Sequence, residues 1–269
     1  MMRLLCWNVQ WCRGIDGKVD PARIAAYARG TGADVICLQE VAIGFADLPG
    51  SSGENQVQIL ERELPGYAAF FAGAVDLPGE AGKRRRFGNM LFSRLPVGRV
   101  LRHALPWCPS DEAPSMPRGA IEAVIEAPSG ALRVIATHLE HYSGTIRAAQ
   151  IERLGQIYRE GDHPVPAMRE GPFQPLPRPV SALVCGDFNM PPEDALHARM
   201  LANGFVDAWE TLQPGTPHPA TFHVFEEGKT ACCYDYVFAS EDLAPRLRSI
   251  RVDGANQCSD HQPVIVELG

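Results

Sequence analysis

Long apolar runs are missing from this 269-residue sequence. No segment approaches the roughly 20 apolar residues that a membrane-spanning helix needs. Met1-Met2-Arg3 leads directly into the strand-like run from Leu4 to Asn8, which leaves no stretch long enough for a signal peptide. We therefore expect a cytoplasmic protein without stable membrane association.

Cysteine pairs of the metal-binding type are also missing. None of the eight cysteines belongs to a Cys-x-x-Cys pair, and Cys232-Cys233 is adjacent, which excludes a zinc ribbon and a dithiol redox motif. Cys6, Cys37 and Cys185 lie inside apolar runs, where a free cysteine packs as a small hydrophobic residue. This use of cysteine is typical of a reducing compartment.

An excess of positive charge is absent as well. The formal net charge of −7 and the pI of about 5.6 argue against a protein that coats nucleic acid through bulk positive charge. The basic run Lys83-Arg84-Arg85-Arg86 is interpreted as a solvated loop between strands rather than as a phosphate-binding segment.

Nothing in the sequence marks a domain boundary, because it has no Ser/Gly linker, internal repeat or charge block. With 45% hydrophobic side chains the chain can bury a large core, and we expect residues 1–269 to form a single domain. The sequence gives no indication of a protein partner.

Helix-like and strand-like segments alternate along the chain. Asp20 and Pro21 form a helix start, an N-cap residue followed by proline at the first helical position. The pattern also predicts helices over 54–64, after Ser143 and over 192–202, and strands over 67–72, 88–93, 120–126, 131–137 and near Asp235 and Pro263. Because hairpins pair antiparallel and helix crossovers pair parallel, we expect mixed sheets in a layered α/β fold.

Residues 162–179 contain six prolines and cannot form a regular element. The segment is long for a connection between elements. It is either a disordered excursion or a loop that shapes the mouth of a substrate site, and the sequence leaves both interpretations open.

Polar side chains follow several apolar runs at the point where a strand would end. Asn8 and Glu40 each terminate such a run, Asp187 and Asn189 follow another, and Asp260 lies in the phrase Cys258-Ser259-Asp260-His261. Carboxylates that converge at one edge of a sheet repel each other, and a hard divalent cation relieves this repulsion. The set therefore favours a hydrolytic centre, although each residue alone is an ordinary turn former.

Eight short phrases carry a resemblance to a known family: Trp7-Asn8-Val9, Leu38-Gln39-Glu40-Val41, Gly88-Asn89-Met90-Leu91-Phe92-Ser93, Arg118-Gly119, Thr137-His138-Leu139, Gly186-Asp187-Phe188-Asn189, Tyr234-Asp235-Tyr236-Val237 and Ser259-Asp260-His261. In this order they resemble the endonuclease/exonuclease/phosphatase superfamily, which includes deoxyribonucleases, exonuclease III and sphingomyelinases. The resemblance spans nearly the whole chain. It implies a four-layer α/β sandwich, in which two mixed β-sheets pack face to face with helices outside.

The resemblance also implies a magnesium-dependent phosphoesterase, with manganese as a substitute for the metal. Glu40 would be the principal metal ligand, and Asn8 and Asp260 would coordinate the ion or hold its waters. Asp187 would orient or deprotonate the attacking water. Asn189 would hold this water or a phosphoryl oxygen.

Two histidines and an arginine complete the implied site. His261 would face the scissile phosphate, donating to a non-bridging oxygen or transferring a proton, and Asp235 would fix the tautomer of its imidazole. His138 matches a second histidine of the deoxyribonuclease and sphingomyelinase branches. Arg118 matches an arginine that contacts phosphate in the same branches.

Other interpretations accompany some of these residues. Asn89 is equally a residue that turns the chain into its strand, and Thr221-Phe222 is interpreted as a pair that packs in the sheet. His138 and His141 are alternatively a pair of zinc ligands, but the sequence offers no third ligand for them.

The substrate stays open at this stage. The leading hypothesis is a phosphodiesterase with nuclease activity on DNA or RNA. The alternatives are a phosphatase or phosphodiesterase of lipid or small sugar-phosphate substrates, and a non-catalytic binding protein with the same fold. Thr137-His138-Leu139 stands where the abasic-site repair branch carries a tyrosine-containing phrase, which moves the chain away from that branch.

Overall fold

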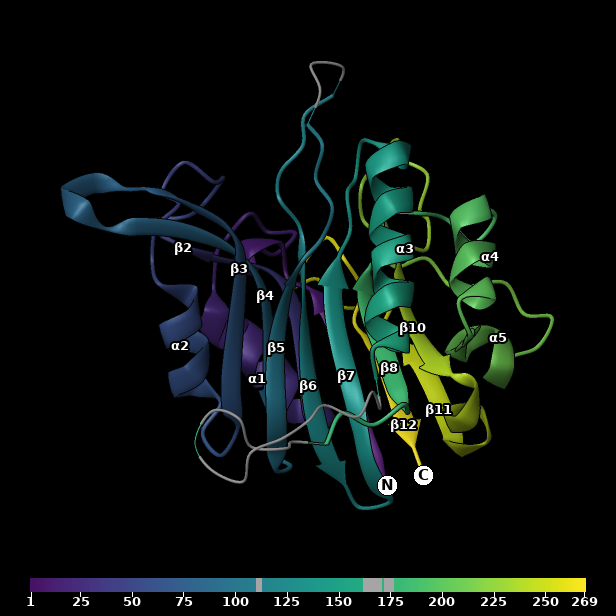
Figure 1. Ribbon diagram of the computed structural model, residues 1–269. Helices are drawn as coiled ribbons and strands as arrows, with labels where there is room; N and C mark the ends of the chain where they lie inside the picture. Colours follow the sequence, from purple (N-terminus) through teal and green to yellow (C-terminus); the bar gives the residue numbers. More distant parts are fainter. Residues whose placement is uncertain (110–112, 162–170, 172–176) are drawn as a thin grey trace.

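Two six-stranded sheets form the centre of the protein in a computed structural model that describes residues 1–109, 113–161, 171 and 177–269 (Figure 1). The first sheet has the strand order β11-β12-β1-β2-β4-β3, and the second has the order β5-β6-β7-β8-β10-β9. Both sheets are mixed: β1 pairs parallel with β2, β7 pairs parallel with β8, and the other pairs are antiparallel.

The strand bounds of the first sheet are β1 Met2–Asn8, β2 Val35–Ile43, β3 Ala68–Pro78, β4 Arg84–Ser93, β11 Leu247–Val252 and β12 Val264–Leu268. Those of the second are β5 Val97–Ala104, β6 Gly119–Ala127, β7 Gly130–His138, β8 Ala182–Asp187, β9 Phe205–Asp207 and β10 Asp235–Ser240. The helices are α1 Pro21–Thr31, α2 Gln56–Glu63, α3 Gly144–Arg159, α4 Ala195–Ala202 and α5 Ala208–Leu212, with short 3-10 turns η1 Gln10–Cys12, η2 Glu80–Gly82 and η4 Glu241–Arg246.

Alternating side chains divide the apolar interior into layers. Leu4 and Cys6 of β1 face the second sheet and join a central core with Leu183 and Cys185 of β8. The intervening Leu5 packs on the other face of the first sheet. Because successive side chains of a strand point to opposite faces, strands that are apolar on both faces need a covering layer on each side.

Helices provide the outer layers. Ile24 of α1 and Leu60 of α2 pack on the outer face of the first sheet. Leu154 of α3 and Met200 of α4 pack on the outer face of the second sheet, and Figure 1 shows these two helices side by side in front of it. The predicted four-layer α/β sandwich is therefore confirmed.

The predicted start of α1 is also confirmed. The Asp20 carboxylate accepts a hydrogen bond from the backbone N–H of Arg23, Pro21 is the first helical residue, and Gly32 ends the helix in the left-handed conformation. The helix predicted over 192–202 begins later, at Ala195, because the Asp194 side chain caps it by accepting from the N–H of Leu196.

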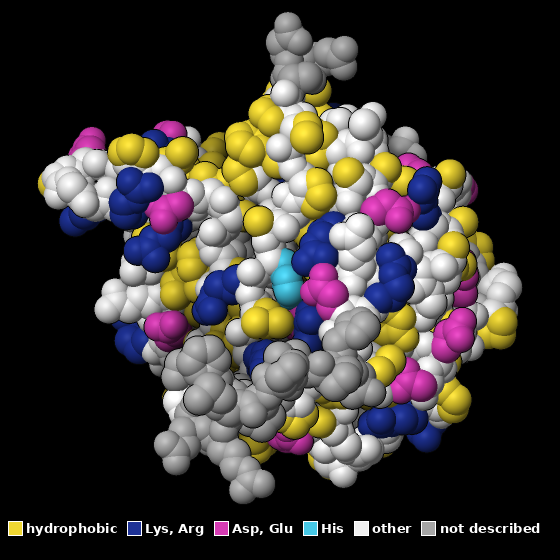
Figure 2. Space-filling view, viewed as in Figure 1, with side chains coloured by type: hydrophobic (Ala, Val, Ile, Leu, Met, Phe, Trp, Pro, Cys, Tyr) yellow, Lys and Arg dark blue, Asp and Glu magenta, His cyan; other side chains and the backbone are white. Residues whose placement is uncertain are grey.

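The basic run contradicts the loop interpretation. Arg84, Arg85 and Arg86 lie on β4, which pairs with an unexpectedly long β3 to form a hairpin that projects from the body (Figure 1). Arg84 forms an ion pair with Asp76 at 2.7 Å, and Arg85 forms one with Asp47. Figure 2 accordingly shows basic and acidic side chains beside each other on this projection.

The structure contains three strands, β5, β9 and β11, that the sequence did not predict. Most of the proline-rich segment 162–179 lies outside the described residues. Among the helices of the described ranges, none is both long and apolar enough to cross a membrane.

Candidate active site

The polar strand ends meet at one edge of both sheets. The parallel pairing sets Asn8 of β1 opposite Gln39 of β2, and His138 of β7 opposite Asp187 of β8. The chain termini lie at the other end of these strands, where Met2 pairs with Leu268 (Figure 1). Because parallel strands end at the same edge, β1 and β2 deliver one group of side chains and β7 and β8 the other.

Asn8 joins the two groups. Its Nδ2 donates to Glu40 Oε1 at 3.1 Å and to Asp187 Oδ2 at 3.0 Å, and its Oδ1 accepts from the backbone N–H of Gln10 at 3.0 Å. The amide nitrogen, not the oxygen, therefore faces the carboxylates. The sequence predicts that Asn8 coordinates the ion or holds its waters, and direct coordination would need the amide oxygen, which here accepts from Gln10.

Two of the predicted site residues, Glu40 and Asn189, have left-handed backbone conformations that set the direction of their side chains. Glu40 has φ 60° and lies where the pairing of β2 with β4 shifts between Leu38 and Val41. Asn189 has φ 52°, and its backbone N–H donates to Asp187 Oδ1 at 2.9 Å. Non-glycine residues seldom adopt this conformation, and such strain concentrates at functional sites.

A glycine permits the close approach of β8 to β7. Gly186 has φ 152°, and a Cβ added there would lie 1.9 Å from the carbonyl oxygen of Thr137. Position 186, directly before Asp187, therefore accepts no side chain. The absence of a side chain there lets the two polar strand ends, His138 and Asp187, lie adjacent.

A pocket of about 220 Å³ opens onto this edge. Its lining residues are Gln10, Trp11, Glu40, Arg118, His138, His141, Tyr142, Asp187, Asn189, Phe222, Asp260 and His261. Glu40 and Asp260, which come from opposite ends of the sequence, thus line one pocket. Of the other predicted site residues, Asp235 lies behind His261 and Asn8 lies beneath the carboxylates of Glu40 and Asp187.

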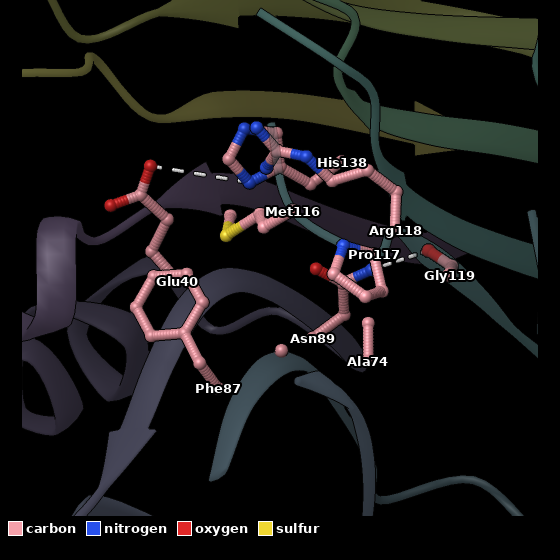
Figure 3. A pocket seen from close by; sticks show the side chains of 10 residues that line it. Glu40, Ala74, Phe87, Asn89, Met116, Pro117, Arg118, Gly119 and His138 are labelled. Atoms are coloured by element: carbon pink, nitrogen blue, oxygen red, sulfur yellow. Dashed lines mark hydrogen bonds and ion pairs between the residues drawn. The ribbon is translucent and has the colours of Figure 1, made fainter. Parts of the chain in front are cut away.

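A smaller pocket adjoins the first on the side of Arg118. Figure 3 shows the Glu40 carboxylate pointing toward the His138 ring, with Met116 beside them. The His138 Nδ1 and Glu40 Oε1 atoms are 4.0 Å apart. Asn89 donates from Nδ2 to the carbonyl oxygen of Gly119 at 2.9 Å, so it ties β4 to β6 rather than simply turning the chain.

Arg118 is buried and incompletely paired. Its Nε lies 3.7 Å from Glu140 Oε2, and only 8% of the residue is exposed. Its Nε and Nη1 atoms have no hydrogen-bond partner among the residues that the structure describes. Buried polar groups are nearly always hydrogen-bonded, so these nitrogens fit an anionic ligand.

His261 is held by an acid on one side and an aromatic ring on the other. Its Nδ1 contacts Asp235 Oδ2 at 2.8 Å, and the Phe222 ring stacks on the imidazole with centroids 4.4 Å apart. Burial alone lowers the pKa of His261, but the carboxylates of Asp235 and Asp187 outweigh it and raise this pKa well above the usual value. The imidazole is therefore positively charged at neutral pH.

Thr221 and Phe222 do not behave as the predicted sheet pair. Thr221 Oγ1 accepts from the backbone N–H groups of Tyr234 and Asp235 at 3.0 and 3.1 Å. The two residues lie outside the named strands, although Phe222 forms isolated bridges with Cys232 and His261. They thus support Asp235 and His261 at the pocket wall.

The second histidine, His138, is neutral rather than positively charged. Burial, with the positive charges of Arg118 and His261, holds the pKa of His138 well below its usual value. Asn189 Nδ2 lies 3.1 Å from His138 Nε2, which fits an unprotonated acceptor nitrogen. Two groups of one type with pKa values driven apart are typical of acid and base roles.

His141 contacts the oxygen of the Asn189 side-chain amide. Its Nδ1 lies 2.6 Å from Asn189 Oδ1, while Asn189 Nδ2 also donates to the carbonyl oxygen of Leu139 at 2.9 Å. His138 and His141 therefore flank one amide instead of converging as a zinc pair. Sequence reasoning had considered His141 only as a zinc ligand.

Gln10 is a pocket residue that the sequence did not predict. Its Nε2 donates to Asp260 Oδ2 at 2.5 Å, from a turn in which Gln10 and Trp11 have φ values of 45° and 41°. Its place two residues after Asn8 was the available signal, because residues that follow a strand end face the same sheet edge.

The carboxylates of this pocket are costly to ionise together. Burial, with the charge of Asp235, raises the pKa of Asp187 to about 6 against the opposing effect of His261. Burial, with the charge of Glu40, raises that of Asp260 to about 6, again opposed by His261. Burial also raises the pKa of Glu40. A divalent cation would relieve this repulsion, and carboxylate oxygens suit magnesium or manganese.

The metal-compatible group of side chains at this pocket differs from the predicted ligand set. Single ligand atoms of Asp187, Asp235 and His261 all lie within 4.8 Å of one another. The ring of His261 faces Asp235 through Nδ1 and lies 3.6 Å from Asp187 Oδ2 through Nε2, which suits a charged imidazole between two acids. The predicted ligands Glu40 and Asp260 border the open pocket beside this group.

An α/β sandwich that gathers acids, histidines and a buried guanidinium at one sheet edge is typical of phosphate-ester hydrolysis. Residues 5–261 match the model of the Endonuclease/Exonuclease/phosphatase family. The chain belongs to this family, whose members are hydrolases acting on phosphate esters.

Solved structures with the same fold cover nearly the whole chain. An endonuclease/exonuclease/phosphatase from Beutenbergia cavernae DSM 12333 is 24% identical, has a TM-score of 0.75 and covers 100% of this chain and 72% of its own. A mannosyl-6-phosphatase from Bacteroides thetaiotaomicron VPI-5482 (18%, TM-score 0.67) covers 100% of both chains. TDP2 of D. rerio, complexed with a single-strand DNA product (19%, TM-score 0.68), covers 98% of this chain and 97% of its own. A search of the curated proteins finds no significant match.

The charge of His261 is open to direct measurement. Replacing Asp235 with Asn removes the acid at Nδ1, so the pKa of His261 should fall, because the charged imidazole loses its main stabilising partner. Side-chain ¹⁵N NMR of histidine, recorded against pH in the presence of EDTA, measures this shift. Glu226→Gln is the matched control, since Glu226 pairs with His223 instead. An unchanged His261 titration in Asp235→Asn would contradict the pairing.

Proposed function

We propose that this protein is a divalent-metal-dependent phosphodiesterase that cleaves nucleic acid. The observation that carries the proposal is the convergence of acids, one protonated and one neutral histidine, and an incompletely paired Arg118 on one pocket. A phosphodiester anion repels its attacking nucleophile, so its hydrolysis needs positive charge around phosphorus, a base at the water and an acid or metal at the leaving oxygen.

Glu40 and Asp260 are proposed to hold the cation, with magnesium or manganese as the metal. Both side chains border the open pocket, and Gln10 fixes one carboxylate oxygen of Asp260 at 2.5 Å. When bound, the ion would neutralise charge on the phosphoryl and leaving oxygens. Asn8 is proposed to hold Glu40 and Asp187 at a fixed spacing through its amide nitrogen, instead of ligating the ion.

Asp187 is proposed as the general base. Its raised pKa of about 6 keeps it ionised at neutral pH, yet basic enough to accept a proton from water. Asn189 is proposed to position that water or a phosphoryl oxygen. Its amide is fixed by His141, His138 and the carbonyl of Leu139, so it is oriented before the substrate arrives.

Charged groups surround the expected position of the phosphate. The protonated His261 is proposed to donate from Nε2 to a non-bridging oxygen, while Asp235 holds its ring. Arg118 is proposed to contact a second oxygen through its unpartnered nitrogens. His138, neutral and opposite Glu40, is proposed to donate from Nδ1 toward the reacting group.

The preference for nucleic acid is supported by the fold neighbour that holds a single-strand DNA product. A neighbour that is a mannosyl-6-phosphatase supports the sugar-phosphate alternative. The paired arginines of the β3–β4 hairpin add little to either case, since Arg84 and Arg85 already contact acids. The pocket contains both histidines of the deoxyribonuclease and sphingomyelinase branches, which suits either class of phosphodiester. We favour nucleic acid because of the neighbour that holds a DNA product.

Hydrolysis of bis-p-nitrophenyl phosphate tests the mechanism. We expect activity with magnesium or manganese that EDTA abolishes. Asp187→Asn should lower kcat by about 10²–10⁴-fold, the usual contribution of a general base. His261→Gln should lower it by about 10²–10³-fold, the usual contribution of one donor to a charged oxygen. Glu152→Gln, which alters an exposed acid of α3 paired with Arg199, should keep full activity.

Activity that survives EDTA, or that Asp187→Asn leaves unchanged, would contradict the proposed mechanism. Complete inactivity toward a broad panel of phosphate esters would favour a binding protein that has kept only the fold.

A substrate panel tests the preference for nucleic acid. Plasmid, single-stranded DNA, RNA, phosphatidylinositol phosphates, sphingomyelin and mannose 6-phosphate are incubated with the protein under one metal condition, with Asp187→Asn as the control for contaminating enzymes. We expect cleavage of at least one nucleic acid by the unaltered protein and none by the variant. Intact nucleic acids, with turnover of a lipid or sugar phosphate, would refute the preference.

A further inference from the structure

Two further histidines converge on one acid outside the proposed catalytic pocket. His197 of α4 and His218, which follows α5, each place Nε2 2.9 Å from the same oxygen of Asp207, Oδ2. Glu210, in the first turn of α5, brings a carboxylate oxygen to the group, and one ligand atom from each of the four residues lies within 4.8 Å of the others. None of these residues lines the catalytic pocket.

Asp207 is fixed by the fold at this position. It ends β9, and its other oxygen, Oδ1, caps α5 by accepting from the backbone N–H groups of Trp209 at 2.6 Å and Glu210 at 3.3 Å. Oδ2 is thereby left to face the two imidazoles. The acid is therefore held in place by a helix that does not depend on the histidines.

The group is buried on one side and open on the other. His197 and Asp207 are 4% and 2% exposed, and the side chain of His218 is 8% exposed. The Tyr236 ring lies 5.5 Å from the His197 ring and 5.6 Å from the His218 ring. Glu210 is exposed, so it offers an entry path from solvent.

The geometry fits one small transition-metal ion. Bonds of about 2.0–2.2 Å place the ligand atoms of a tetrahedral zinc ion about 3.4 Å apart. Asp207 Oδ2 forms 2.9 Å hydrogen bonds with both imidazoles, so binding of the ion would displace the Nε2 protons and widen this spacing. Two imidazoles with carboxylates favour zinc and related metals, whereas magnesium and calcium prefer ligands that are all oxygen.

We propose that His197, Asp207, Glu210 and His218 form a second metal site, of zinc type, which ties α4, β9 and the segment at His218 to one another. It is chemically distinct from the oxygen-rich catalytic pocket. Its role is structural, because four protein ligands leave no open position for a substrate. It does not depend on the proposed function, since it uses none of the catalytic residues.

Metal binding by the full chain tests this proposal without any activity assay. After dialysis against EDTA, the protein is titrated with Zn²⁺ in competition with a chromophoric chelator, and with Co²⁺ followed by visible absorption. We expect one tight Zn²⁺ site, the intense absorption of tetrahedral Co²⁺, and a Zn²⁺-dependent rise in Tm. His218→Gln should weaken Zn²⁺ binding by at least about tenfold and abolish the Co²⁺ band.

Matched variants separate this site from others. His103→Gln alters a histidine that contacts a single buried acid, Glu122, and Asp260→Asn alters the catalytic pocket. Both should retain tight Zn²⁺ binding and the Co²⁺ band. Exposed Glu210→Gln, which leaves the buried group intact, should lower Zn²⁺ affinity without lowering the Tm of the metal-free protein.

Two results would contradict the proposed second metal site. Absence of tight Zn²⁺ binding in the unaltered protein would overturn the proposal and leave the group as a hydrogen-bonded cluster, which His218→Gln would then destabilise irrespective of metal. Zn²⁺ binding that is lost in Asp260→Asn but kept in His218→Gln and Glu210→Gln would also overturn it, since the ion would then belong to the catalytic pocket.

Discussion

Electrostatic repulsion among buried acids is the constraint on which the rest of this structure depends. Glu40, Asp187 and Asp260 come from different parts of the chain, yet they border one pocket, where burial raises the pKa of each. Asn8 offsets part of this cost by donating to two of them, and His261 offsets more with its positive charge. We propose that a divalent cation relieves the remaining cost of burying these charges, so that the arrangement that destabilises the metal-free fold prepares it for hydrolysis.

The sandwich is what keeps these acids together. An apolar core between the sheets fixes β1 and β8 against each other, and Asn8 and Asp187 at their ends form a 3.0 Å hydrogen bond from one sheet to the other. The left-handed residues Glu40 and Asn189 direct their side chains into the pocket. Rigid strands therefore place the polar groups, and short irregular turns orient them.

The four-layer architecture and the gathering of polar strand ends could be predicted because they depend on apolar runs and the residues that terminate them. The conformation of Glu40 could not, because a bulge in β2 depends on its pairing with β4. The amide direction of Asn8 and the hydrogen bond from Gln10 to Asp260 could not be predicted either, because both depend on contacts between residues far apart in the sequence. The extension of β3 and β4 beyond the predicted strands 67–72 and 88–93 was missed because three consecutive arginines interrupt the apolar pattern of a strand, and acids on neighbouring segments compensate two of them. The group at His197 and His218 leaves no local motif, since its histidines lie on either side of Asp207 on separate elements.

Anomalous diffraction from a crystal of this protein soaked in Mn²⁺ near neutral pH tests the central claim most directly. We expect an anomalous peak in the pocket from a Mn²⁺ ion coordinated by the carboxylates of Glu40 and Asp260, with the amide nitrogen of Asn8 still directed at Glu40 and Asp187. An empty pocket at a Mn²⁺ concentration that saturates hydrolysis, or an ion bound only at another place, would contradict it.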